Sequence, residues 1–231
     1  MRRKPRLGEA AFVIGTVVLS FATSLMAKAG FGMSVGVSPA YVMAAMLGVT
    51  PGTMSYLFQG ALVMLTFVLV RGFRPSFLFS FVAAVLFGLM VDFFSEICLA
   101  GVVLTLMRQR IAFYVAGLLL NSLAVAFLLH SYFPPQAPEL FVKNLAPVIK
   151  KSVYRTKHIF DICMFTLSLG LSLLAFHEIR FIGVGTLIAA AINGPLIGVY
   201  GRAMDRYLDF SPCFPRIASF FVHEREREEK K

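Results

Sequence analysis

Long uncharged apolar stretches separated by short polar segments run through the whole chain. No charged residue lies between Lys28 and Arg71 or between Arg110 and Glu139. Each of these gaps exceeds the roughly 20 residues that a helix needs to cross the hydrocarbon core of a bilayer. The pattern predicts an all-α membrane protein with six transmembrane helices, over residues of about 9–28, 52–70, 75–94, 111–131, 158–177 and 181–200.

Three shorter segments lie between these spans. Pro39 and Pro138 each precede a short apolar run, and proline is favoured in the first turn of a helix. A third run, residues 97–107, is too short to cross the membrane comfortably. We therefore expect short interfacial or re-entrant helices at all three places.

The two halves of the chain resemble each other in the order of these features. Most of the matched positions lie about 102 residues apart, although identity is low. The matches are Gly15 with Gly117, Ser20 with Ser122, Pro39 with Pro138, Gln59 with Asp161 and, after a four-residue slip, Gly88 with Gly194. Because each half has three crossings, the halves enter the membrane from opposite sides. Transporters built from such inverted repeats bind their substrates near the midplane, between the repeats.

This division gives a basic N-terminus, 1–8, a first three-helix repeat, 9–107, a second repeat, 108–207, and a tail, 208–231. Lysine and arginine in the short loops fall mostly on one side, which predicts that both termini are cytoplasmic. Arg108 and Arg110 then lie on the outer side, against this trend. A cleavable signal peptide is the alternative interpretation of the start. The matching span in the second half favours a retained first helix.

Composition supports a membrane protein and excludes several other classes. The chain is 58% hydrophobic and 15% charged, whereas soluble domains are nearer half apolar and a quarter charged. The net charge of +10 comes from residues at the ends of apolar runs, so we expect no nucleic-acid partner. The three cysteines, Cys98, Cys163 and Cys213, form no ligand-like pairs. We expect no metal site and no cofactor.

Glycine-rich and proline-rich motifs in the third span of each half carry a family resemblance. These motifs are Phe87–Asp92, Ile182–Thr186 and Ile192–Pro195, with Gly32–Pro39 and Arg74–Phe81 as further matches in the first half. The sequence resembles the YczE/YyaS/YitT group of bacterial multi-pass membrane proteins over about residues 10–207. The resemblance implies a fold and a bacterial inner-membrane location, and it does not imply a particular activity.

Asp161 is the sharpest candidate for a ligand-binding residue. A carboxylate just inside an apolar helix is costly unless it faces a cavity or a partner. An ion pair with Lys157 or His158 is the alternative. Gln59 holds the matching position, and we expect both side chains to border one central cavity, or to act as gates on opposite faces. A hydrogen bond that links two helices is the other role open to Gln59.

Asn121 and Asn193 are amides inside apolar spans and form a second group of candidates. Pro195 follows Asn193 closely, and proline removes a backbone donor, which can open a helix toward a cavity. A packed kink is the alternative for this segment. Either way, the sequence predicts that polar groups reach the middle of the fourth and sixth spans.

Asp92, Glu96 and Thr186 complete the candidate site. Asp92 and Glu96 are one helical turn apart, so they can bind a cation together or remain solvated at the end of the third span. Thr186 begins a stripe of small residues in the sixth span. Such stripes either line a site or let helices approach closely.

The sequence has no catalytic constellation. HExxH, GxSxG and phosphate-loop motifs do not occur in it, so we expect no enzyme activity. The leading interpretation is a small-molecule or ion transporter that works at the interface of the two halves. A non-transporting accessory or regulatory protein and a substrate-binding subunit of a larger importer stay open. Expected partners are membrane lipids, the substrate, and a second copy or another membrane protein.

Overall fold

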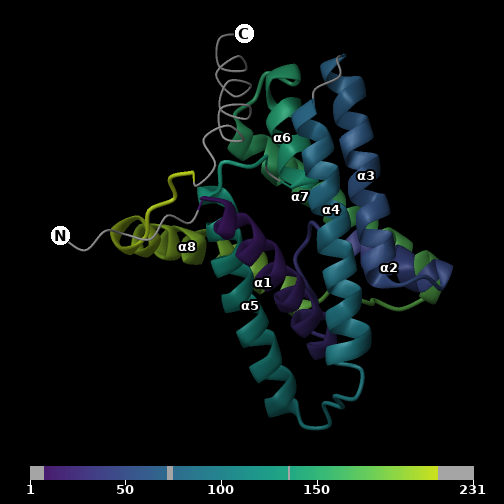
Figure 1. Cartoon of the computed structure of the whole chain (residues 1–231). Coiled ribbons are helices and arrows are strands. Elements are labelled where there is room, and N and C mark those ends of the chain that lie inside the picture. Colours follow the sequence, from purple (N-terminus) through teal and green to yellow (C-terminus); the bar gives the residue numbers. More distant parts are fainter. Residues whose placement is uncertain (1–7, 72–74, 135, 213–231) are drawn as a thin grey trace.

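The computed structural model describes residues 8–71, 75–134 and 136–212, and its regular elements there are helices (Figure 1). Side-chain environments are described for these residues except 75, 76 and 154. In chain order the elements are α1 (Gly8–Ala29), α2 (Ser38–Leu47), α3 (Pro51–Val70), α4 (Pro75–Asp92), the π-helix η1 (Phe93–Cys98), α5 (Met107–His130), α6 (Ala137–Val148), α7 (Val153–Phe176) and α8 (Val184–Tyr207).

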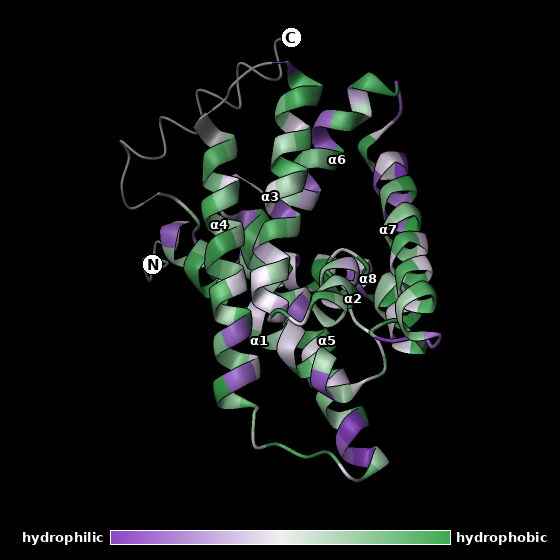
Figure 2. Cartoon of the chain, turned by 90° about the vertical axis from the view of Figure 1, so that its right-hand side faces the viewer, coloured by the Kyte–Doolittle hydropathy of each residue, from purple (hydrophilic) through white to green (hydrophobic). Residues whose placement is uncertain are grey.

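Six helices in the described residues are long and apolar enough to cross a membrane, which confirms the predicted spans. They are α1, α3, α4 with η1, α5, α7 and α8. Figure 2 shows hydrophobic residues over most of their length and hydrophilic ones gathered near the ends, as at the lower ends of α4 and α5. The predicted N-terminus, up to residue 7, and the tail beyond residue 212 lie outside the described residues.

Two of the three predicted short helices are confirmed. Helices α2 and α6 both carry proline in their first turn. The prediction of a helix over residues 97–107 is wrong, because η1 ends at Cys98 and the chain stays non-helical until Met107. Gly101 and the β-branched Val102, Val103 and Thr105 lie in this segment, and such residues are poor helix formers.

The first helices of the two halves, α1 and α5, form the best-packed pair of the fold. They run antiparallel, and glycines let their backbones approach. A Cβ atom added at Gly117 would lie 3.0 Å from the carbonyl oxygen of Ala22, and one at Gly15 would lie 3.2 Å from that of Ala124. These two contacts correspond to each other, because Ala22 and Ala124 are also 102 residues apart.

Serine hydrogen bonds connect α1 with α4 and α5 with α8 in matching places. Ser20 donates to the carbonyl oxygen of Phe87 at 3.2 Å. Its counterpart, Ser122, donates to Oδ1 of Asn193 at 2.8 Å. Phe87 and Asn193 are the residues directly before Gly88 and Gly194, so they match under the same four-residue slip.

Arg110 has a structural partner at the end of α1. Its Nε donates to the carbonyl oxygen of Ala29 at 2.8 Å, and its guanidinium lies 5.1 Å from the centre of the Phe31 ring. A cation at the C-terminus of a helix satisfies carbonyl groups that lack an intrahelical partner. This contact accounts for the position of Arg110 without reference to the orientation of the chain in the membrane.

The two halves differ in how their last two long helices pack. Helices α3 and α4 pack side by side, with the backbone of Gly52 against that of Gly88. Helices α7 and α8 form no comparable pair, and a Cβ added at Gly194 would meet no atom within 4 Å. Figure 1 shows α8 running to the left, across the direction of α3 and α4.

The sequence of α7 differs from that of α3 at two glycine positions. Gly52 and Gly60 allow α4 to approach α3, and Gly60 lies directly against the Phe81 ring. The positions 102 residues later in α7 are Tyr154 and Ile162. Larger residues thus stand in α7 where α3 has glycines. An open space remains between α7 and α8.

Candidate ligand site

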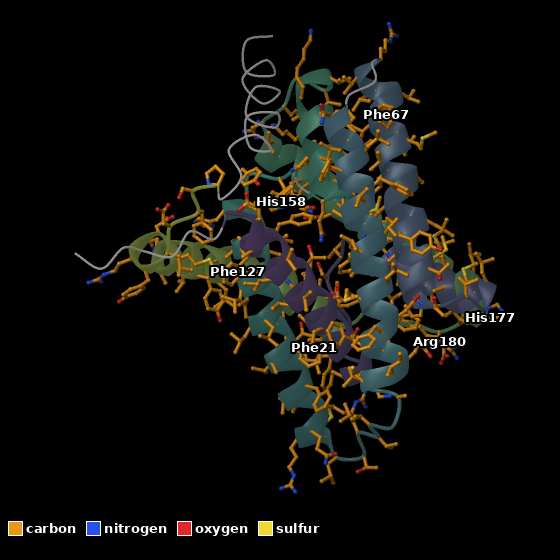
Figure 3. All side chains as sticks on the ribbon, in the orientation of Figure 1. Phe21, Phe67, Phe127, His158, His177 and Arg180 are labelled. Carbon is orange, nitrogen blue, oxygen red and sulfur yellow. The ribbon has the colours of Figure 1, made fainter. Side chains whose placement is uncertain are left out.

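A cavity of about 550 Å³ occupies the space between α7 and α8. Its walls also include parts of α1, α5 and α6 and the segment before α2, so both halves of the chain contribute. Pockets that bind small molecules usually have volumes of about 300–1,000 Å³. Figure 3 labels His158 and His177 near the two ends of α7, and His158 lies at the end that borders the cavity.

One side of the cavity carries an ion-pair cluster formed by Glu139, Lys157 and Asp161. Nζ of Lys157 lies 3.0 Å from Oδ1 of Asp161 and 3.5 Å from Oε1 of Glu139. Lys157 and Asp161 are one turn apart on α7, and Glu139 comes from the first turn of α6. The predicted alternative of an Asp161–Lys157 ion pair is therefore observed, and the pair also borders the cavity.

Asn121 and Asn193 face the same cavity from α5 and α8. The Asn121 side chain is only 4% exposed, and no hydrogen bond to its amide is found in the described part of the chain. Oδ1 of Asn193 accepts the hydrogen bond from Ser122, which leaves the amide hydrogens of Asn193 for another acceptor. Two amides can thus hydrogen-bond to a molecule in the cavity.

Thr186 also lines the cavity, but its hydroxyl already has a structural contact. Oγ1 of Thr186 accepts from the backbone N–H of Gly183 at 3.3 Å, at the start of α8. The rest of the lining is mainly apolar and comes from α1, α4, α5, α7 and α8. It includes Leu19, Phe87, Val125, Ile162, Phe165 and Ile197.

The structure places the other three predicted site residues away from this cavity. Gln59 is buried in α3 at 3% exposure, and its Oε1 has no hydrogen-bond partner in the described residues. It does not meet Asp161 in the cavity. Glu96 is exposed on η1. Within the described ranges, no group of three or more His, Cys, Asp or Glu residues could hold a metal ion.

Asp92 stabilises the start of α3. Its Oδ1 accepts from the backbone N–H of Gly52 at 2.6 Å, and its Oδ2 accepts from Thr50 Oγ1 at 2.6 Å. A carboxylate at a helix N-terminus satisfies free N–H groups and complements the helix dipole. Both oxygens of Asp92 are therefore engaged in packing α3 against α4.

Sequence reasoning did not select Glu139 or Lys157 as site residues in their own right. Comparison of the two proposed repeats offers a signal for Glu139, because the residue after Pro39 is Ala40 whereas the residue after Pro138 is Glu139. The second half thus gains a charge at a position where the first half is apolar. Such a difference between matched positions points to a site in one half only.

Six long apolar helices and an internal cavity define the class of protein: an integral, multi-pass membrane protein. Residues 7–202 match a family of unknown function (DUF6198), and the chain belongs to this family. No curated protein and no solved structure matches the sequence. The narrower resemblance to the YczE/YyaS/YitT group stays a prediction.

Proposed function

We propose that the protein is a transporter of a small molecule or ion in the bacterial inner membrane, working between two inverted repeats without chemical conversion of its substrate. One observation carries the proposal: a ligand-sized cavity, built by both halves, holds an ion-pair cluster and the unpartnered amide of Asn121. The Asn121 amide borders the cavity and can therefore hydrogen-bond to a molecule inside it. A bound ligand would supply the missing hydrogen bonds.

Contacts between matched positions support the proposed inversion of the two halves. The antiparallel α1–α5 pair uses Gly15 and Gly117 in equivalent roles. The hydrogen bonds of Ser20 and Ser122 are equivalent in the same way. Two halves related by a two-fold axis in the membrane plane would produce such reciprocal contacts.

An exposed apolar face on α7 is compatible with a second candidate function, a substrate-binding subunit of a larger importer. Ile162 is 65% exposed and Leu174 is 79% exposed. This face can contact lipid or pack against another membrane protein. Copurification of an ATPase, with uptake only in its presence, would favour the importer subunit over a transporter that works alone.

Membrane orientation can be tested by labelling single cysteines. We expect Val49 to lie outside and Lys150 inside, because the lysine-rich and arginine-rich loops should face the cytoplasm. Val49 and Lys150 are both exposed, whereas Ser38 is buried and hydrogen-bonded to Ser168, so Ser38 is a poor labelling site. In a cysteine-free background, an impermeant maleimide should label intact cells at position 49 and not at 150. Labelling of both from outside would contradict the six-span topology.

The ligand role of the cavity can be tested through Asn121. A thermal-shift screen of metabolites identifies compounds that raise the melting temperature, because a ligand of the native state stabilises it. We expect each such compound to be taken up by proteoliposomes that contain the protein. For these compounds, Asn121→Leu should weaken binding at least about tenfold, or ~1.4 kcal/mol. The matched control is Asn144→Leu, since Asn144 bonds within α6 and lies outside the cavity lining. Equal affinity in both variants would rule out the cavity as the ligand site.

A further inference from the structure

We infer that the ligand of the cavity is a small organic cation of charge +1 that also carries a hydrogen-bonding group. Its ammonium group binds beside Lys157 at the carboxylates of Glu139 and Asp161, and its polar group reaches the amides of Asn121 and Asn193. This inference rests on the proposed function only in using the same cavity as the ligand site.

The charges that line the cavity do not balance. Glu139 and Asp161 contribute two negative charges and Lys157 contributes one positive charge, and these form one cluster. His158, the remaining titratable group of the lining, adds no charge when its imidazole is neutral. With both carboxylates ionised and His158 neutral, the unliganded cavity carries a net charge of −1. An excess of negative charge attracts cations, so a ligand of charge +1 is favoured over an anionic one.

The geometry leaves acceptors for this cation. Lys157 contacts one oxygen of each carboxylate, Oδ1 of Asp161 and Oε1 of Glu139. Within the described residues no hydrogen bond is found to the second oxygen of either carboxylate. Lys157 and Asp161 are partly exposed and Glu139 is exposed. An ammonium group donates hydrogen bonds and accepts none. It can therefore use the two free oxygens, whereas an anion would meet carboxylates on both sides of Lys157.

Size and lining favour an organic ion over a metal ion. A volume of about 550 Å³ is far larger than a water molecule's share of liquid volume, about 30 Å³. The described residues contain no metal-ligand group. Apolar side chains such as Phe87, Phe165 and Val125 would contact carbon atoms of the ligand. The amides on α5 and α8 would orient a hydroxyl or carbonyl group.

Three related probes separate the classes of ligand: ethanolamine, which is cationic at neutral pH, its uncharged N-acetyl derivative, and anionic glycolate. The measurement is the melting temperature of the purified full-length protein in detergent at constant ionic strength. We expect ethanolamine to raise it, and the other two probes to have no effect. Asp161→Asn and Glu139→Gln should each raise, at least tenfold, the ethanolamine concentration needed for a given rise in melting temperature. Glu96→Gln is the matched control, because Glu96 is an exposed carboxylate outside the cavity.

Lys157→Gln gives an independent test if the carboxylate variants do not fold. A cation held by the carboxylates should bind this variant as well as or better than the unchanged protein, whereas an anion held by Lys157 should be lost. Stabilisation by glycolate, no stabilisation by ethanolamine, or an ethanolamine effect that survives in both carboxylate variants would overturn the inference. Binding without uptake into proteoliposomes would keep the cation site and reject transport. Uptake of another compound, without binding of ethanolamine, would keep transport and reject the cation site.

Discussion

Replacing Gly88 by alanine is expected to destabilise the protein by about 1–3 kcal/mol, the usual cost of overpacking a close contact. A Cβ atom at this position would lie 2.5 Å from the carbonyl oxygen of Gly52 and 3.0 Å from Cδ1 of Tyr56. The backbone at Gly52 cannot move away easily, because Asp92 accepts a hydrogen bond from its N–H. The melting temperature in detergent and the yield of folded protein should both fall.

The same substitution at Gly194 is the matched control. Gly194 is the counterpart of Gly88 in the second half, and a Cβ added there would meet no atom within 4 Å. Gly194→Ala should therefore leave stability unchanged or raise it by up to about 1 kcal/mol, since alanine favours helix over glycine. Equal losses in the two variants would contradict the open arrangement of α7 and α8.

The six spans could be predicted because length and apolarity alone determine which segments can cross a bilayer. Pro39 and Pro138 revealed the two short helices because the missing N–H of proline is tolerated in a first turn. The prediction failed at residues 97–107. This apolar run is long enough for a short helix, but it contains glycine and β-branched residues. Apolarity indicated burial or lipid contact there, but not helix.

The candidate site was only partly predictable, because a cavity depends on which helices fail to pack. Matched positions suggested equal roles for Gln59 and Asp161. The structure buries Gln59 in the close-packed first half and leaves Asp161 beside the open space of the second. A match in sequence position does not determine how neighbouring helices pack, and Gly52 and Gly60 of α3 correspond to Tyr154 and Ile162 of α7.

If the protein is a transporter, as proposed, the open α7–α8 space suggests how access to the cavity would change. In the first half α3 and α4 are closed on each other, and in the second half α7 and α8 are apart. Inverted repeats that exchange such conformations would expose a site first to one side of the membrane and then to the other. Transport would then require α7 and α8 to move relative to each other.

Fixing α7 to α8 by a cross-link is therefore expected to stop transport. Ile162 and Leu187 line the cavity from α7 and α8, and both are well exposed. Cysteines at these two positions, in a background without Cys98, Cys163 and Cys213, can be treated with bifunctional maleimides of graded length, and the shortest one that bridges them is used. Uptake by the cross-linked protein should fall at least about tenfold, because alternating access depends on relative motion of packed units.

The single-cysteine variants, treated with the same reagent, control for modification of the cavity wall. Each carries one attached group but no bridge, so both should retain more uptake than the bridged protein. Chemical cleavage of a reducible version of the linker should restore uptake, which a misfolded protein would not show. Full uptake by protein that gel analysis shows to be completely bridged would mean that α7 and α8 keep their spacing during transport. The cavity would then have to open through movement of α1, α4, α5 or α6, the other helices that form its walls.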